Sequence, residues 1–253
     1  MSLTDRSKRE FIRRGYLTLR GIVPRMKIGP ALRVINQKLG SGSRKGASPE
    51  HVPFFSDLFN SPELMSLLME TKLWPVVESL LGPGCAQRPQ AEVTLGFPNM
   101  DASAHFNAKE LHIDGLPDKG RRETYTLNVG VFLSDVPGPN MGNFKACPGS
   151  HLWVAEHARR FGPYGINPAL RDLRGTAGET DELIARAGDA VVCHYNLVHA
   201  RQWNASPHIR YAVFFRVYAK GHLTRWQYVM REPWVEWAGL AHLRPKNAGS
   251  TAD

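Results

Sequence analysis

One change of pattern along the chain does most to limit its possible folds. Apolar residues recur at helical spacing up to about residue 84, and short β-rich runs take over from about residue 90. Turn-forming stretches at 135–140 and 187–189 separate the later runs. Because strands and helices do not alternate in the second half, a doubly wound parallel sheet is disfavoured. We expect a mainly β chain with helices, a β-sandwich or jelly roll with N-terminal helical buttresses.

The expected elements follow from this pattern. Helices are predicted over residues 4–14, 30–39 and 62–81. Thr4 caps the first of them, Pro75 breaks the last, and Gly82 stops it. Residues 11–23 are expected to hold the end of the first helix and a strand, and the Gly/Ser-rich stretch 40–49 predicts a loop. Further strands are predicted over residues 91–97, 110–114, 125–133, 190–195 and 211–218.

Size and composition are those of a folded protein. The 253 residues are 42% hydrophobic and 22% charged, which excludes a disordered chain. No apolar run approaches the ~20 residues of a membrane helix, and no hydrophobic segment near Met1 resembles a signal peptide. The three cysteines are scattered without C-x-x-C spacing, which fits a reducing compartment. We expect a cytoplasmic protein with one domain over 1–253, divided into a helical part (1–84), a jelly-roll core (85–220) and a C-terminal extension (221–253).

Basic residues concentrate in the first 46 positions. Twelve Lys and Arg stand there against Asp5 and Glu10, so this segment carries the net charge of the chain, which is +9. Such a segment can attract nucleic acid, an anionic membrane or an acidic partner. However, the charges alternate with apolar residues and lack an aromatic stacking platform, which favours a solvated surface. We expect neither a nucleic-acid nor a membrane partner, and keep a nucleic-acid-binding protein as an alternative.

Two histidines and one carboxylate are the first candidates for chemistry. His112 and Asp114 lie two apart, so in a strand both side chains project to one face and can converge on a metal ion. His199 stands where an apolar run leaves the core. Two His and one carboxylate form the ligand set of non-haem Fe(II) oxygenases, whereas closed zinc sites prefer four protein ligands. His194, five residues before His199 in the same expected strand, would face the other side and is expected to be packed.

Arg210 is the fourth candidate. It comes eleven residues after His199 and leads into the apolar run 211–215. A buried guanidinium is costly unless an anion meets it, and its planar fork matches a carboxylate. An exposed arginine at the end of a strand is the alternative.

The order of these residues resembles that of the Fe(II)/2-oxoglutarate dioxygenases. In detail it resembles the phytanoyl-CoA dioxygenase (PhyH-like) family. The matching parts are the F-x-x-x-G-Y-x-x-x-x-G opening at 11–21, the pair His112 and Asp114, the segment 142–151 that ends in P-G-S-H, and the run from His199 through Asn204 and Ser206 to Arg210.

The resemblance implies a fold, a cofactor and a reaction. It implies a double-stranded β-helix in which His112, Asp114 and His199 hold Fe(II) and Arg210 pairs with the distal carboxylate of 2-oxoglutarate. The implied activity uses O2 and 2-oxoglutarate to hydroxylate a C–H bond of a small organic molecule, with release of succinate and CO2. His151 lies in the implied structural turn and is not expected to be a ligand.

Further contacts to 2-oxoglutarate are less defined. Arg201 stands where many members of the family place a small hydroxyl residue, so it either adds a second cationic contact or points outward. Thr126 and Asn128 are candidates because they alternate along one expected strand. His105 and Lys109 are expected in a surface loop or lid.

Other groups have two interpretations each. Arg121 and Arg122 lie in a solvated turn or meet an anionic substrate, and the tryptophans complete cores or line a cavity. Asp114 disfavours a halogenase, because related halogenases replace this carboxylate with Gly or Ala. Desaturation, epimerisation or cyclisation at the same site remains an alternative to hydroxylation, as does a jelly-roll protein that binds metal and ligand without turnover.

Overall fold

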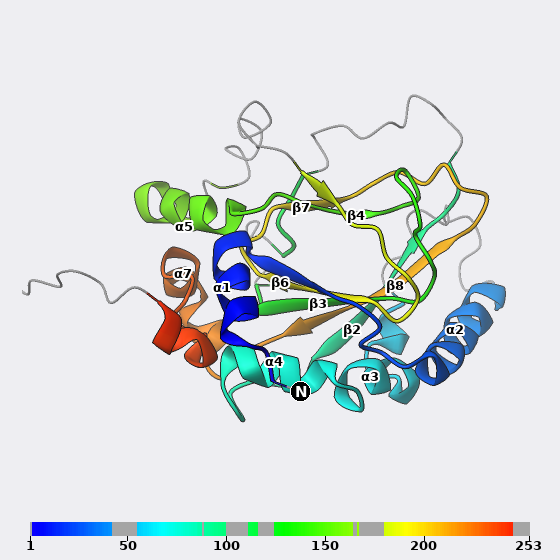
Figure 1. Ribbon diagram of the computed structural model, residues 1–253, viewed down its shortest axis with the longest axis horizontal. Helices are drawn as coiled ribbons and strands as arrows, with labels where there is room; N and C mark the ends of the chain where they lie inside the picture. Colours follow the sequence, from blue (N-terminus) through cyan, green and yellow to red (C-terminus); the bar gives the residue numbers. More distant parts are fainter. Residues whose placement is uncertain are drawn as a thin grey trace, which may run out of the picture.

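The structure is a computed structural model that describes residues 2–41, 55–87, 89–99, 111–115, 124–163, 166 and 180–244. Two antiparallel sheets lie one above the other (Figure 1). The large sheet has the order β1-β6-β3-β8-β2 and the small sheet the order β5-β4-β7. Their strands are β1 (Tyr16–Leu19), β2 (Gln90–Gly96), β3 (Leu127–Phe132), β4 (Phe144–Ala146), β5 (Asp181–Glu182), β6 (Ala190–His194), β7 (His199–Arg201) and β8 (Arg210–Val217). The fold is the expected jelly roll with helical buttresses.

Helices cover the outer face of the large sheet. The described helices are α1 (Asp5–Arg14), α2 (Arg25–Gly40), α3 (Pro62–Met69), α4 (Leu73–Leu81), α5 (Ser150–Phe161) and α7 (His222–Arg231), with short 3-10 helices η2 (Ser56–Leu58) and η7 (Ala238–Leu243). The first four lie against the large sheet, while α5 and α7 lie together at one end of the two sheets (Figure 1). Val129 and Val213 of the sheet join one core cluster with Phe11 of α1, Leu67 of α3 and Leu80 of α4. The opposite face of the sheet is left for the interior of the jelly roll.

The N-terminal helices confirm the predicted helical periodicity, but some of them begin or end at other residues than predicted. Thr4 caps α1 by accepting a hydrogen bond from the Ser7 amide. The second helix begins at Arg25, five residues before the predicted start. The predicted break at Pro75 is wrong: the chain breaks between α3 and α4, and Pro75 lies in the first turn of α4, where no intrahelical donor is lost.

The strands of the large sheet match their predicted ranges to within two residues. The strand expected over 110–114 is wrong for the described residues there, because His112 makes only an isolated bridge to His199. The prediction that His194 and His199 share a strand is also wrong, because His194 ends β6 and His199 begins β7.

Helices also return after residue 84, which the pattern did not predict. The segment that follows P-G-S-H forms α5, and the expected C-terminal extension contains α7. The two helices pack on each other, and their buried residues Val154, Ala158, Trp226 and Met230 belong to one core cluster.

Some predictions fall on residues outside the described ranges, namely the loop 40–49 from residue 42 onward, His105, Lys109, Arg121 and Arg122. Within the described part, no helix is both long and apolar enough to cross a membrane. Trp237 and Trp226 are buried in cores, as expected.

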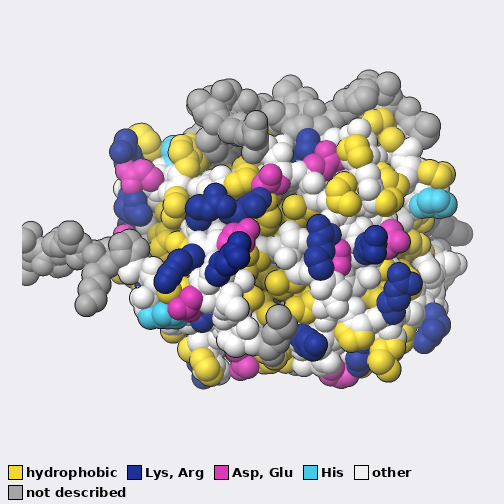
Figure 2. All heavy atoms as spheres, in the orientation of Figure 1, with side chains coloured by type: hydrophobic (Ala, Val, Ile, Leu, Met, Phe, Trp, Pro, Cys, Tyr) yellow, Lys and Arg dark blue, Asp and Glu magenta, His cyan; other side chains and the backbone are white. Residues whose placement is uncertain are grey.

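The basic N-terminal segment is interleaved with acidic groups. Arg14 pairs with Asp181, Arg20 with Asp189, and Lys27 with Glu70. Figure 2 shows Lys and Arg side chains spread over one face, with Asp, Glu and apolar side chains between them. This arrangement fits the expected solvated surface.

Candidate metal centre and co-substrate pocket

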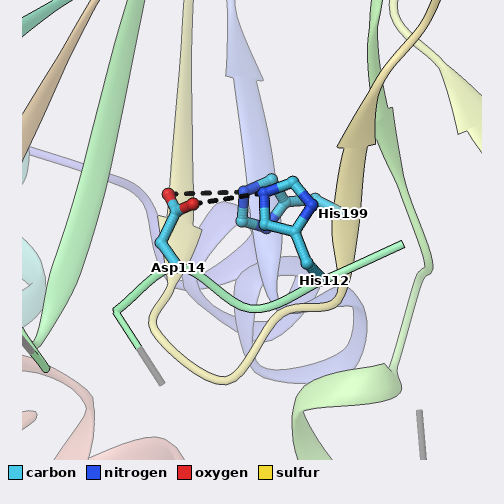
Figure 3. A group of neighbouring side chains, drawn as sticks. All are labelled: His112, Asp114 and His199. Carbon is cyan, nitrogen blue, oxygen red and sulfur yellow. Dashed lines mark ion pairs between the residues drawn. The ribbon is translucent and has the colours of Figure 1, made fainter. Parts of the chain in front are cut away.

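His112, Asp114 and His199 converge on one point between the sheets (Figure 3). The Nε2 atom of His112 lies 3.2 Å from Asp114 Oδ1, and the Nε2 atom of His199 lies 3.5 Å from Asp114 Oδ2. One ligand atom from each residue lies within 4.8 Å of the others. Reciprocal backbone hydrogen bonds of 2.9 and 3.0 Å between His112 and His199 bring their imidazoles together. The geometry therefore unites the three residues that the sequence singled out.

The second nitrogen of His199 fixes the orientation of its ring. Its Nδ1 donates a hydrogen bond of 2.9 Å to the Leu197 carbonyl, so Nε2 is the nitrogen that faces Asp114. The ring stacks on Phe144 at a centroid distance of 5.2 Å. The side chains of His112, Asp114 and His199 are 49%, 26% and 9% exposed, so His199 is the most deeply buried of the three.

The Asp114 carboxylate is kept ionised. Burial alone would raise its pKa, but the charges and hydrogen bonds of His199 and His112 outweigh burial and hold the pKa well below its usual range. Its Oδ2 also accepts hydrogen bonds from Tyr125 Oη at 3.2 Å and Asn128 Nδ2 at 3.3 Å. Two imidazole nitrogens and one ionised carboxylate that leave further positions open suit Fe(II) in a non-haem site. The residues present therefore fit the implied metal.

A cavity of about 350 Å³ adjoins the three residues. It is lined by Glu92, Thr94, His112, Asp114, Phe132, Phe144, His199, Ala200, Arg201, Arg210, Phe214 and Arg216. Five of these twelve project from alternate positions of β2 and β8, on the inner face of the large sheet. Its volume is within the range of small-molecule sites.

Arg210 is buried at the end of this cavity where β8 begins. Its Nη1 donates to the Thr94 carbonyl at 3.1 Å and to Thr94 Oγ1 at 2.9 Å, while Nε has no hydrogen-bond partner. Among the described residues no carboxylate pairs with it. Burial, reinforced by the charge of Arg201, lowers the pKa of Arg210 to about 9. A buried guanidinium that no described carboxylate pairs is suited to bind the carboxylate of a dianionic co-substrate.

The remaining predicted contacts are divided between the pocket and other surroundings. Arg201 lines the cavity and donates to the Leu95 carbonyl. Asn128 reaches Asp114. Thr126 lies away from the pocket: its hydroxyl donates to Glu236 Oε2 at 2.6 Å and accepts from the Ala219 amide at 2.9 Å.

Two other buried histidines, His194 and His151, take no part in the site, as expected. His194 Nε2 donates to the Pro233 carbonyl at 2.8 Å, and His151 Nε2 donates to the Ile12 carbonyl at 3.0 Å. Burial lowers the pKa of His194 to about 3 and that of His151 to about 4, so both are neutral packing groups.

The sequence interpretation missed Tyr125, Glu92 and Arg216. Glu92 Oε1 pairs with Arg216 Nε at 2.9 Å, and both line the cavity. A parity signal was available, because Arg216 follows Arg210 by six positions in one strand and therefore lies on the same face. Tyr125 offered no such signal, since it precedes β3 and reaches Asp114 only through the fold.

Comparisons with known structures agree with this fold. The carbocyclase SnoK from nogalamycin biosynthesis, described as non-heme and alpha-ketoglutarate-dependent, is 21% identical with a TM-score of 0.62, over 88% of this chain and 90% of its own. HygX from Streptomyces hygroscopicus, solved with nickel and 2-oxoglutarate, is 18% identical with a TM-score of 0.55, over 87% and 88% of the two chains. EctD from S. alaskensis with bound Fe is 19% identical with a TM-score of 0.54, over 86% and 77%.

The sequence comparisons give the family. No curated protein matches the chain significantly. The family model described as phytanoyl-CoA dioxygenase (PhyH) matches residues 18–212, which is well over half of the chain and includes His112, Asp114, His199 and Arg210. The chain therefore belongs to the phytanoyl-CoA dioxygenase family, whose members are Fe(II)- and 2-oxoglutarate-dependent enzymes.

Proposed function

We propose that this protein hydroxylates a C–H bond of a small organic molecule, consuming 2-oxoglutarate and O2 and releasing succinate and CO2. One observation carries the proposal: the candidate ligands His112, Asp114 and His199 share a cavity with Arg210, a buried guanidinium that no described carboxylate pairs. A metal set with open positions and a separate receptor for a carboxylate are the two requirements of this co-substrate.

Each residue has a defined task in the proposal. His112 and His199 would hold the metal through Nε2, and Asp114 through its carboxylate. Bound there, Fe(II) supplies the activation of O2 that is coupled to oxidative decarboxylation of 2-oxoglutarate. Asp114 must stay ionised for this, and its lowered pKa ensures that it does.

Arg210 would orient the co-substrate. Its hydrogen bonds to Thr94 fix the guanidinium before any ligand arrives, so an ion pair with the distal carboxylate loses little side-chain entropy. Arg201, on the opposite sheet and lining the same cavity, adds a second positive charge. Phe144 and Phe214 stack at a centroid distance of 5.8 Å and line the cavity, and their apolar rings would limit water near the reacting groups.

Other oxidative outcomes at the same site are the second candidate. Similar structures include the carbocyclase SnoK and the epimerase SnoN, both described as non-heme alpha-ketoglutarate-dependent. The product must therefore be identified by mass, because hydroxylation adds one oxygen atom, cyclisation removes two hydrogen atoms, and epimerisation changes no mass.

The first experiment is an anaerobic titration of the apoprotein with Fe(II) and then 2-oxoglutarate, followed by a substrate screen for succinate release. The proposal expects a weak visible charge-transfer band when both are present, and its loss in Asp114→Ala. Arg33→Met, a change at an exposed arginine on α2 far from the pocket, serves as control and should keep the band. The chelate band without succinate on any substrate, and without uncoupled turnover, would support a binding protein instead and contradict the proposal.

A further inference from the structure

The carboxylate of Asp114 has two oxygens in different surroundings. Oδ1 lies 3.2 Å from His112 Nε2. Oδ2 accepts hydrogen bonds from Tyr125 Oη at 3.2 Å and from Asn128 Nδ2 at 3.3 Å, besides lying 3.5 Å from His199 Nε2. Tyr125 and Asn128 are themselves joined by a hydrogen bond of 3.3 Å. One oxygen of the carboxylate thus accepts hydrogen bonds from two donors, Asn128 on β3 and Tyr125 just before it.

The backbone alone does not fix this carboxylate. Residues 111–115 are joined to the small sheet through the single bridge between His112 and His199, and Asp114 lies two residues beyond it. Two side-chain torsions then decide which oxygen faces the imidazoles. Within the described residues, Tyr125 and Asn128 are the groups outside the candidate ligand set that hydrogen-bond to the Asp114 side chain.

Both donors are held firmly in place. Tyr125 is 1% exposed, and its ring packs edge-on against Tyr195 at a centroid distance of 4.9 Å. The guanidinium of Arg216 lies over the same ring, 5.5 Å from its centroid. Asn128 is 2% exposed and belongs to the central strand β3, paired with β6 on one side and β8 on the other. They can therefore impose an orientation on Asp114 rather than follow it.

The amide of Asn128 is unfavourable for stability. A carboxylate only accepts hydrogen bonds, so the amide must turn Nδ2 toward Asp114. Its Oδ1 is then buried without a hydrogen-bond partner. An unsatisfied buried acceptor costs about 1–3 kcal/mol. An apolar side chain of the same size would avoid this cost, so the asparagine serves the carboxylate rather than the core.

We propose that Tyr125 and Asn128 are positioning residues of the metal centre: by occupying Oδ2, they leave Oδ1 of Asp114 as the ligand atom that faces His112. The inference rests on the proposed function of the three ligands. It assigns Asn128 to the metal centre instead of to 2-oxoglutarate, which the strand parity had suggested. Partners of this kind support metal affinity by orienting a ligand without touching the metal.

The test measures metal binding by the whole protein in the absence of 2-oxoglutarate and substrate. Tyr125→Phe removes only the hydroxyl and keeps the ring packed against Tyr195. Asn128→Leu removes the amide at similar volume. Tyr211→Phe is the matched control, because Tyr211 lies on β8 but donates its hydroxyl to Asn36, away from the cavity. Affinity for Ni(II) and anaerobic Fe(II) is obtained by competition with a chromophoric chelator, and the visible spectrum of the Co(II) form reports the ligand geometry.

Each of the two variants should bind metal about 10- to 100-fold more weakly than the wild type and alter the Co(II) spectrum. Tyr211→Phe should do neither. Because both donors serve one oxygen, their effects should be coupled rather than additive in the double variant. The melting temperature of the apoprotein should not fall in Asn128→Leu, which distinguishes positioning from a structural role.

Two results would overturn the inference. One is unchanged metal affinity in a folded double variant. The other is a loss of 2-oxoglutarate affinity at saturating metal with metal affinity intact, which would return Asn128 to the co-substrate. A wild-type protein that binds none of these metals would instead contradict the proposed function itself, so the two failures can be told apart.

Discussion

Replacing Arg210 by methionine should leave the stability of the apoprotein nearly unchanged while destroying its response to 2-oxoglutarate. The guanidinium is buried without a carboxylate partner among the described residues, and burial lowers its pKa to about 9. At 1.36 kcal/mol per pH unit, this fall from the ordinary value of an arginine corresponds to about 5 kcal/mol against the charged form. The two hydrogen bonds to Thr94 return about 1.5–3 kcal/mol each and would be lost with the arginine. Methionine should therefore change the unfolding free energy by between a gain of about 2 and a loss of about 1 kcal/mol.

The sign of the effect with pH follows from the direction of the shift. The folded state has the lower pKa, so the unfolded state binds more protons from about pH 9 up to the ordinary pKa of an arginine, and stability rises with pH only in that window. At pH 7 the arginine is charged in both states, and the whole penalty is present. Methionine removes the penalty together with the hydrogen bonds to Thr94, so the melting temperature should change by only about 2–4 °C per kcal/mol of net difference.

The assay is thermal unfolding at pH 7 with Ni(II), with and without 2-oxoglutarate. At a ligand concentration of 100 times Kd, the wild type should gain about 2.7 kcal/mol, and Arg210→Met should gain nothing. Arg33→Met, at an exposed position on α2, should match the wild type in both measurements. A methionine variant that is less stable than the wild-type apoprotein by clearly more than about 1 kcal/mol, or that keeps the full 2-oxoglutarate shift, would refute the reasoning.

Three further predictions concern the ligand, the core and the cavity. Asp114→Ala should abolish Fe(II)-dependent succinate formation, and wild-type turnover in this variant would remove Asp114 from the ligand set. Burial lowers the pKa of His194 to about 3, so below the pKa of about 6.5 that the imidazole has in the unfolded chain, the unfolded state takes up a proton that the folded state does not. Each pH unit below about 6.5 then costs about 1.4 kcal/mol of unfolding free energy. The wild type should therefore lose more stability than His194→Phe between pH 7 and 5. Gly130→Ala should place a Cβ 2.5 Å from the Phe214 ring and push that ring into the cavity, at a cost of about 1–3 kcal/mol in unfolding free energy and with weaker 2-oxoglutarate binding; unchanged binding would show that Phe214 moves elsewhere.

The sequence predicted the strands of the large sheet well because most of their residues are apolar or β-branched and because turn-forming stretches separate several of them. It failed for α5 and α7, whose apolar residues are spread among charged ones in a half that otherwise reads as β. Pro75 was misplaced for a local reason: a proline is tolerated in the first turn of a helix, so it marks a start as readily as a break.

The candidate ligands were predicted for partly wrong reasons. His112 and Asp114 do converge, although their segment is a single bridge and not a strand. His194 is indeed packed, although it is separated from His199 by the end of β6. The metal site could be predicted from the residue types and their order along the chain, because two imidazoles and one carboxylate form a ligand set with few other uses. Tyr125 could not be found in this way, because a buried tyrosine is ordinary until the fold places its hydroxyl against a carboxylate.

Two polar groups of the site share a physical property that explains why they mark function. Arg210 Nε and Asn128 Oδ1 are both buried without a hydrogen-bond partner in the described part of the chain. Each carries the cost of an unsatisfied buried polar atom. One lies where a co-substrate carboxylate is needed and the other behind a metal ligand, at opposite ends of the inner face formed by β3 and β8. Because the two groups serve different partners, the two variants should lose different functions while keeping their stability: Arg210→Met should lose its response to 2-oxoglutarate, and Asn128→Leu should bind metal more weakly.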